Sequence, residues 1–407
     1  MGPRSEIIPF EEVLEVRFGN VTAMPVEGTL HELPWAGAGK HHIGEVLCET
    51  YWPPSFRNGA KQGACSRHVA ENQLQRLRAN LGYRLYSSFE AEFMIFEHGT
   101  LKPIFDGTDI FANLRFAEFE TFLYDVDEKL AGSGVFLETL QTEYAAGQFE
   151  LVTKPTYNIE AADAMFCLKE GIKEMCMLRG WDATFMTKPL PKELCGNGMH
   201  FNMSIWSISE KKNLFYDATK ADGISDAMRY WIAGLLKHSG ALTALCSPTV
   251  NCYRRLNHPW APGRADWGID DRMSGVRVKN GGPEATYLEN RIPGGSANPY
   301  LILAATVAAG MDGIVKRLEC PPTRTDSAAG DDGTGTAADG VDQHQQHHLP
   351  ATLSEALVAL ERDEVMADAL GAEFVSWFVK VKREVEIAKL EGVDDVDLEQ
   401  QMYFTFL

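Results

Sequence analysis

The stretch Phe89-Glu90-Ala91-Glu92-Phe93 alternates apolar and acidic side chains. Successive side chains of a β-strand point to opposite faces, so this alternation predicts a strand with both carboxylates on one face and the apolar residues on the other. Two adjacent carboxylates repel each other unless a cation lies between them. A solvated strand face is the usual place for Glu, so this stretch alone fits either a solvated face or a metal site.

Three further runs repeat the pattern. Their polar residues are Glu143 and Glu150 in EYAAGQFE, His200, Asn202 and Ser204 in GNGMHFNMS, and Tyr287, Glu289 and Arg291 in TYLENR. A single His in such a run is also a common structural residue. Together, the five Glu and one His supply hard oxygen ligands with one borderline nitrogen. This combination predicts Mg²⁺ or Mn²⁺ and not a structural zinc.

Arginines cluster between these runs, although the chain as a whole is acidic. The cluster comprises Arg254, Arg255, Arg264, Arg272 and Arg277. Arginine binds carboxylates and phosphates in bidentate fashion better than lysine does. The cluster therefore predicts a local anion site, and surface loops remain an alternative for Arg254 and Arg264.

Composition excludes several classes of function. The 407 residues carry 38 Lys+Arg and 57 Asp+Glu, a net charge of −19, which disfavours nucleic acid and anionic membranes as partners. No Walker A, GxGxxG, GxSxG or HExxH motif is present, so hydride transfer and serine hydrolysis lack their usual residues.

The same composition bears on location. The first 25 residues lack the pattern of a signal peptide, and the eight cysteines form no CxxC pair. The most apolar stretch, Pro299 to Met311, is shorter than the roughly 20 residues that span a bilayer and is expected to be a buried helix. We therefore expect a cytoplasmic protein with reduced thiols.

Outside these runs, turn-rich sequence before about Leu81 predicts a small N-terminal domain. Residues 323–348 form a low-complexity tract that predicts a disordered loop, whose His344, His347 and His348 fit a solvated linker better than a metal site. Two helices have start signals: Asn158 as the cap of a helix running to Gly180, and the capping box of Thr352 and Glu355. In the first helix the apolar period predicts a buried stripe of Met165, Leu168, Ile172 and Met175.

Seven blocks in order resemble the signature blocks of type I glutamine synthetases. They are SSFEAEF, EYAAGQFEL, ATFMTKP, GNGMHFNMS, NCYRRLNHPWAP, WGIDDRMSGVRV and LENRIPGGSANPYLILAATVAAGMDGI. Their character is most similar to lengsin and the γ-glutamyl-amine ligases of this superfamily. The resemblance implies an α+β fold, in which a curved antiparallel sheet with flanking helices (81–407) follows a shortened, partial β-grasp-like domain (1–80).

The resemblance also implies roles for individual residues. One metal would be held by Glu92, Glu143 and Glu150, and a second by Glu90, His200 and Glu289. The amino-acid substrate and amine would contact Arg255, Arg291, Gly196 and Trp260. ATP would lie at Arg272, Arg277, Asn202 and Tyr287, and catalysis would involve Arg272 and Arg291. The implied cofactors are two Mg²⁺ or Mn²⁺ ions, with ATP as co-substrate. The implied assembly is a ring homo-oligomer.

The chain departs from the family pattern in ways that leave two functions open. The family's Asp-Gly-Ser-Ser loop has no match before Pro25, Trp260 replaces a Glu that accepts a proton from ammonium, and Asn202 and Tyr287 replace a His and an Arg near the nucleotide. One expectation is an ATP-dependent ligase that joins the γ-carboxylate of glutamate to ammonia or a larger amine through a γ-glutamyl phosphate. The alternative is a lengsin-like scaffold with the same fold and no turnover.

Overall fold

A nine-stranded sheet forms the centre of the chain in this computed structural model, which describes residues 8–17, 19–107, 110–256, 258, 260–324, 348–393 and 395–407. Its strands are β5 (Tyr83–Glu97), β6 (Leu137–Thr142), β7 (Gln148–Thr153), β8 (Thr156–Tyr157), β9 (Trp181–Thr184), β10 (Met199–Ser207), β11 (Trp267–Ile269), β12 (Val276–Asn280) and β13 (Thr286–Asn290). They lie in the order β11-β12-β13-β10-β5-β7-β6, with β8 and β9 also paired to β5. Every pair is antiparallel except β11 with β12, so the predicted antiparallel sheet is confirmed apart from this edge pair.

The central strand β5 has the two faces that its alternation predicts. Phe89, Ala91 and Phe93 are completely buried in the main hydrophobic core. Glu90 and Glu92 lie on the other face and line a cavity. Burying the aromatic side chains is favourable by roughly 1.5–3 kcal/mol each, which holds the strand in a register that presents both carboxylates to the cavity.

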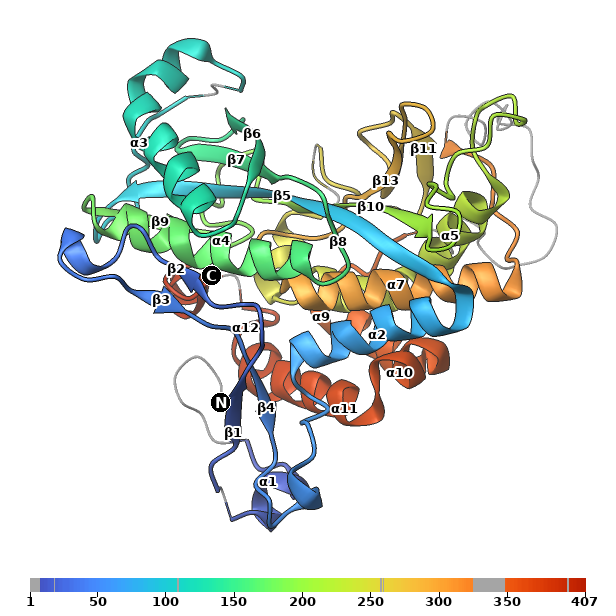
Figure 1. The fold of residues 1–407 in the computed structure, drawn as a ribbon. Helices are drawn as coiled ribbons and strands as arrows, with labels where there is room; N and C mark the ends of the chain where they lie inside the picture. The colour runs from blue at the N-terminus through green and yellow to red at the C-terminus, as the bar shows by residue number, and fades with distance from the viewer. Residues whose placement is uncertain are drawn as a thin grey trace.

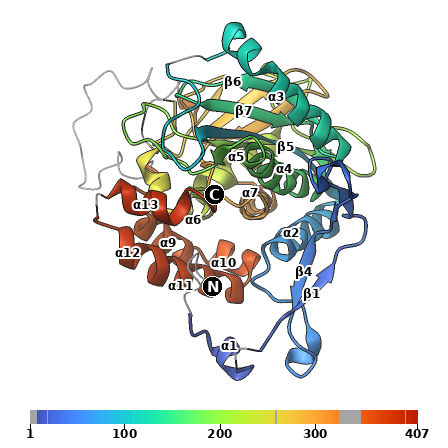
Figure 2. The same cartoon turned by 90° about the vertical axis from the view of Figure 1, so that its left-hand side faces the viewer.

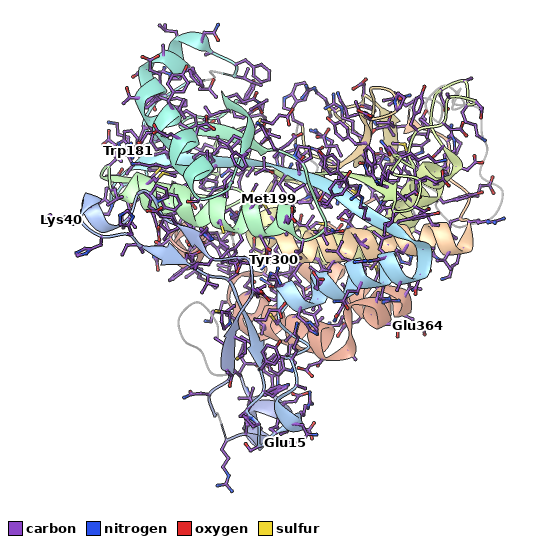
Figure 3. All side chains as sticks on the ribbon, in the orientation of Figure 1. Glu15, Lys40, Trp181, Met199, Tyr300 and Glu364 are labelled. Carbon is purple, nitrogen blue, oxygen red and sulfur yellow. The ribbon has the colours of Figure 1, made fainter. Side chains whose placement is uncertain are left out.

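The described residues also form twelve α-helices, of which some, including α4 and α7, lie on one face of the sheet (Figure 1). The helices are α1 (Glu11–Glu15), α2 (Ser66–Leu81), α3 (Asn113–Gly132), α4 (Glu160–Met177), α5 (Asp226–Lys237), α6 (Ser239–Cys246), α7 (Pro299–Lys316), α9 (Leu353–Arg362), α10 (Glu364–Leu370), α11 (Ala372–Val381), α12 (Ala388–Leu390) and α13 (Val396–Tyr403). In Figure 3, Met199 marks the sheet, and Tyr300 marks α7 in the helical layer below it. The predicted class, a sheet with flanking helices, is thus confirmed.

Helix α4 forms where its apolar period predicts it but begins differently. Its predicted buried residues, Met165, Leu168, Ile172 and Met175, are all inaccessible to solvent. The prediction that Asn158 caps it is wrong: the cap position is Ile159, and no side chain caps the helix. Asn158 instead takes a left-handed conformation with φ 58°, and its N–H donates to the Leu85 carbonyl of β5.

Helix α7 is the buried helix predicted from Pro299 to Met311, but it continues to Lys316. The Asn298 side chain caps its start by accepting from the N–H groups of Tyr300 and Leu301. Among the described residues, α7 is the one helix long and apolar enough to cross a membrane, and 78% of it is buried inside the protein. It is a core helix packed between α2 and α5.

Two small sheets lie before α2, within the predicted N-terminal domain. They pair β1 (Thr22–Pro25) with β4 (Cys48–Tyr51) and β2 (His31–Glu32) with β3 (Gly44–Glu45). Figure 2 shows β1 and β4 on one side of the molecule and the helices α9 to α13 on the other. The Phe10 ring stacks on Trp377 of α11 with centroids 4.4 Å apart. The boundary at residue 80 stays a prediction.

The low-complexity tract lies almost entirely outside the described residues, including His344 and His347. His348 is described and forms an isolated bridge with Arg264. The Thr352 half of the predicted capping box is present: Thr352 Oγ1 accepts from the Glu355 N–H at 3.1 Å at the start of α9. The Glu355 side chain accepts from the N–H of Ala351 at 2.8 Å, one residue before the expected Thr352.

Candidate active site

A cavity of about 950 Å³ lies on the sheet face that carries Glu90 and Glu92. It is lined by every residue to which a role was assigned from the sequence: Glu90, Glu92, Glu143, Glu150, Gly196, His200, Asn202, Arg255, Trp260, Arg272, Arg277, Tyr287, Glu289 and Arg291. They come from β5, β7, β10, β12, β13 and the loops between them. The structure brings all of these residues together, and their individual roles remain predictions.

Strand register places the acidic residues side by side. Glu90 of β5 lies opposite His200 of β10, and Glu92 lies opposite Glu150 of β7. On the other side of β10, Asn202 lies opposite Glu289 of β13. Directly paired residues have Cβ atoms only about 5 Å apart, so two groups of ligand side chains form within one cavity.

We call the first group, Glu90, His200 and Glu289, the arginine-paired cluster. Its ligand atoms lie within 4.8 Å of one another. His200 Nδ1 is 3.4 Å from Glu90 Oε2 and 3.3 Å from Glu289 Oε1. Asn202 Nδ2 donates to Glu90 Oε1 at 2.8 Å. Two carboxylates and one imidazole nitrogen thus converge on one point.

Three arginines balance the charge of this cluster. Arg277 Nη1 donates to Glu289 Oε2 at 3.1 Å, and Arg291 Nη1 donates to Glu289 Oε1. Arg255 Nη2 lies 3.3 Å from His200 Nε2. Burial, and then the nearby Arg291, hold the pKa of His200 well below its ordinary value. The metal-free imidazole is therefore neutral, with Nε2 accepting from Arg255 and Nδ1–H facing the two carboxylates. A cation bound at Nδ1 would require the other tautomer, in which Nε2 carries the proton and no longer accepts from Arg255.

We call the second group, Glu92, Glu143 and Glu150, the amide-paired cluster. Gln141 Nε2 donates to Glu150 Oε1 at 2.7 Å and to Glu143 Oε1 at 3.1 Å. Glu92 Oε2 accepts from the Gly198 N–H at 2.6 Å and from Gln148 Nε2 at 3.4 Å. Neutral amides orient these carboxylates without cancelling their charge.

Burial, together with the uncancelled charge of neighbouring carboxylates, raises the pKa of all three carboxyls of this cluster. Burial, followed by the Glu92 carboxylate, raises the pKa of Glu143 to about 8. Burial and four surrounding carboxylates, Glu90 first, raise the pKa of Glu150 well above its ordinary value. Burial raises the pKa of Glu92 despite the nearby Arg255. A cation among these carboxyls would reverse all three shifts.

The residues fit divalent cations and an anionic substrate. Five carboxylates and one imidazole are the donor set of Mg²⁺ or Mn²⁺. Four buried polar atoms of the cavity lining have no hydrogen-bond partner within the described part of the chain: Ser87 Oγ, Asn202 Oδ1, Arg277 Nε and Arg291 Nε. Buried polar atoms without a partner are costly, so these atoms also indicate a ligand.

The predicted residues Arg272, Arg277 and Trp260 differ in how exposed they are to solvent. Arg272 is exposed at the cavity, whereas Arg277 is buried. Trp260 is 50% exposed, and its φ of 67° is unusual for a bulky residue. Its carbonyl oxygen accepts from Arg291 Nη2 at 3.2 Å. The backbone of Trp260 thus contacts an arginine of the arginine-paired cluster, and the residue lines the cavity.

Two cavity residues, Gln141 and Gln148, were given no role from the sequence. Gln148 lies inside the quoted EYAAGQFEL block, and Gln141 lies two residues before Glu143 in TLQTE. The period of two that selected the carboxylates also places Gln141 on the face of Glu143. This two-residue period was a usable signal for Gln141, but a neutral amide attracts less notice than the carboxylates beside it.

The family model described as "Glutamine synthetase, catalytic domain" matches residues 63–401. The chain belongs to the glutamine synthetase family. It is similar to a glutamate–methylamine ligase of Methyloversatilis universalis, with 32% identity over 92% of this chain and 83% of the relative. A solved structure titled as a GmaS/ADP complex superimposes with a TM-score of 0.78 at 27% identity, covering 94% of this chain and 84% of that one.

Another relative in this glutamate ligase family is lengsin. The rat protein is 30% identical over 89% of this chain, and the chain spans 61% of its length. The resemblance of the signature blocks to glutamine synthetases, lengsin and amine ligases is thereby confirmed. The specific reaction is not settled by these names.

Proposed function

We propose that this glutamine synthetase family member is an ATP-dependent ligase that joins the γ-carboxylate of glutamate to ammonia or a larger amine through a γ-glutamyl phosphate. One observation carries the proposal: two clusters of carboxylates and three buried arginines meet in one cavity. Forming an acyl phosphate requires anionic oxygens of two substrates to approach closely. A cavity with both cation ligands and arginines supplies what that approach needs.

The arginines would bind and orient the anionic groups. Arg255 and Arg291 are almost completely buried, and their guanidinium groups suit a carboxylate or a transferring phosphoryl group. Arg277, held by Glu289, and the exposed Arg272 would contact the ATP phosphates. Divalent cations bound by the two clusters would neutralise the crowded oxygens and withdraw electrons from the transferred phosphoryl group.

The proposed reaction has two steps. An oxygen of the glutamate γ-carboxylate attacks the γ-phosphorus of ATP, the bond to the β-phosphate breaks, and ADP leaves. The amine nitrogen then attacks the acyl carbon, phosphate leaves, and the amine loses one proton as the amide forms. Fixed arginine charges around the cavity would stabilise both transition states because they need no reorganisation during the reaction.

We further propose that the amine is larger than ammonia. The family's proton-accepting Glu is replaced here by Trp260, whose half-exposed indole can pack an alkyl chain and attract a cationic amine through its π face. The relative named as a glutamate–methylamine ligase supports this choice. An alkyl group on the nitrogen would gain apolar contact that ammonium cannot make.

The test is ADP release in the presence of Mg²⁺ and glutamate with ammonium, methylamine, ethylamine, putrescine and an aromatic amine. We expect a higher kcat/KM for at least one organic amine than for ammonium, and Trp260→Glu should shift the preference toward ammonium by about tenfold or more. Trp267→Phe, which changes a tryptophan outside the cavity lining, is the matched control. Ammonium as the best substrate of the native protein would refute the amine proposal.

The second candidate function is a scaffold without turnover. The lengsin relatives favour it. So do Trp260, Asn202 and Tyr287, which stand where the family pattern has other residues. Tyr287 cannot replace the charge of an arginine, because a phenol is never cationic. Burial, Glu90 and Glu289 raise its pKa to about 12, so it is neutral at physiological pH. Cation binding without ADP release from any amine would support the scaffold over the ligase.

We also propose that the chain forms a ring homo-oligomer of at least eight copies. Strand β1 is exposed along its whole length, and large apolar side chains such as Leu30 and Leu114 are 73% and 86% exposed. Exposed apolar surface favours association. A single species of 45.2 kDa in light scattering at micromolar concentration would contradict this proposal.

Within the cell we propose the cytoplasm as the location. All eight cysteines are free thiols, which fits a reducing compartment. Localisation of a tagged full chain tests this.

A further inference from the structure

A second group of metal-ligating side chains lies away from the cavity, where the β2–β3 hairpin packs on α4. It consists of His31 from β2, Glu45 from β3 and Cys167 from α4, whose ligand atoms lie within 4.8 Å of one another. None of the three residues lines the cavity. They belong to the helical side of the sheet (Figure 1), so this group is independent of the proposed ligase.

The hairpin is anchored on the helical layer, so the three side chains are held in place. Trp35 Nε1 donates to Glu174 Oε2 of α4 at 2.6 Å. Gly171 of α4 lies directly against the Trp35 ring, where a Cβ atom would come within 3.0 Å of the indole. Ser133, after α3, donates to the Glu32 carbonyl at 2.7 Å. Lys40 marks the free end of the hairpin in Figure 3.

Hydrogen bonding determines which nitrogen of His31 can bind a metal. Nδ1 lies 2.9 Å from the Thr29 carbonyl oxygen, and a carbonyl only accepts, so Nδ1 carries a proton. In the neutral ring Nε2 then carries the lone pair. Nε2 is buried, has no hydrogen-bond partner among the residues that the structure describes and faces Glu45 Oε1 at 3.7 Å. A lone pair facing a carboxylate is unfavourable unless a cation lies between them.

We propose that His31, Glu45 and Cys167 bind one Zn²⁺ ion. A nitrogen, a carboxylate oxygen and a sulfur are zinc ligands, with a water able to complete a tetrahedron. The sulfur distinguishes this site from the cavity, because Mg²⁺ prefers oxygen ligands. The backbone bond to Nδ1 is the usual outer contact of a metal-binding histidine. Zinc would link the hairpin to α4 across more than 120 residues of chain.

Binding would require the Cys167 thiol to lose its proton to solvent. Burial, followed by the Glu45 carboxylate, raises the pKa of that thiol to about 12, so the metal-free thiol is protonated at neutral pH. A zinc ion beside the sulfur favours the thiolate. One proton is therefore released from Cys167 for each ion bound.

The test uses the full chain, stripped of metal and titrated with Co²⁺, whose bond to a thiolate gives a near-ultraviolet absorption band. We expect a band that saturates at one Co²⁺ per chain and disappears when one equivalent of Zn²⁺ is added. Cys167→Ser should abolish the band, and His31→Gln should weaken Co²⁺ binding by at least tenfold. Cys195→Ser, which alters the cysteine that lines the cavity, is the control and should leave the band intact.

Circular dichroism and Mn²⁺ binding at the cavity show that each variant is folded. Absence of the band in the native chain, or its persistence in a folded Cys167→Ser variant, would overturn the proposal. In that case no metal lies among the three side chains. Loss of the band only in Cys195→Ser would place the cobalt in the cavity and would equally overturn it.

Discussion

The two carboxylate clusters of the cavity have similar ligands but opposite electrostatic surroundings. In the arginine-paired cluster, Glu289 is bonded to two buried guanidinium groups. In the amide-paired cluster, Glu143 and Glu150 share one neutral amide, that of Gln141. Charge is balanced in the first cluster by side chains, whereas in the second it is reduced by protonation, as the raised pKa values of its carboxyls show.

The two clusters would therefore take up a cation in different ways. At the arginine-paired cluster, a divalent ion must compete with Arg277 and Arg291 for the Glu289 oxygens, so binding rearranges side chains. At the amide-paired cluster, an ion replaces protons, so binding depends on pH. Three experiments test whether the two clusters differ in this way.

The largest effect is expected from removing Glu289. Glu289→Ala leaves two buried arginines without their carboxylate and removes one cation ligand, so we expect at least a 100-fold loss of ligase turnover and the loss of one cation equivalent in calorimetry. Glu289→Gln repeats the test with less disturbance to packing. The exposed Glu284, which lines the same cavity, serves as the control through Glu284→Ala. Full activity and two cation equivalents in Glu289→Gln would show that the arginine-paired cluster is not a cation site.

An intermediate effect is expected from Gln141→Ala. This change removes the amide that orients Glu143 and Glu150, and loss of such an outer contact weakens metal affinity by about 10–100-fold. Mn²⁺ titration measures the affinity. Gln401→Ala changes an exposed glutamine outside the cavity and should leave it unchanged. Equal affinity in both variants would mean that the amides do not organise this cluster.

The smallest effect is expected on stability as a function of pH. The pKa of Glu143 is raised from 4.5 to about 8 on folding, so in metal-free protein the folded state binds this proton more tightly than the unfolded state does. Its contribution to stability is therefore lost as pH rises from about 4.5 through 8. We expect the unfolding temperature to fall by a few degrees over this window.

Thermal unfolding of native protein and Glu143→Gln, each with chelator and with Mg²⁺, measures this effect. The decline should be shallower in Glu143→Gln, and Mg²⁺ should stabilise native protein more at pH 8 than at pH 5. Identical pH dependence of the two metal-free proteins would show that Glu143 is not held protonated.

Local pattern was enough to predict much of the fold and the composition of the cavity. Alternation in FEAEF predicted which face of β5 is buried, and the apolar period of α4 predicted its buried stripe. Start signals were less reliable: the Thr352 cap is present, but Asn158 adopts a left-handed turn instead of capping α4. A polar residue near a helix start can cap the helix with its side chain, or it can adopt a turn and use its own backbone N–H. Only the path of the preceding strand decides between the cap and the turn.

By itself, then, the sequence determined which side chains share a strand face, because a period of two is a property of neighbouring residues. Only the tertiary structure decided which charges meet. Glu289 is paired with Arg277 because β12 and β13 lie in that register, and Gln141 reaches Glu150 because β6 lies beside β7. His31 and Cys167 are 136 residues apart in the chain and come together only because the hairpin packs on α4. Electrostatic pairing depends on distance in space, which a local pattern does not encode.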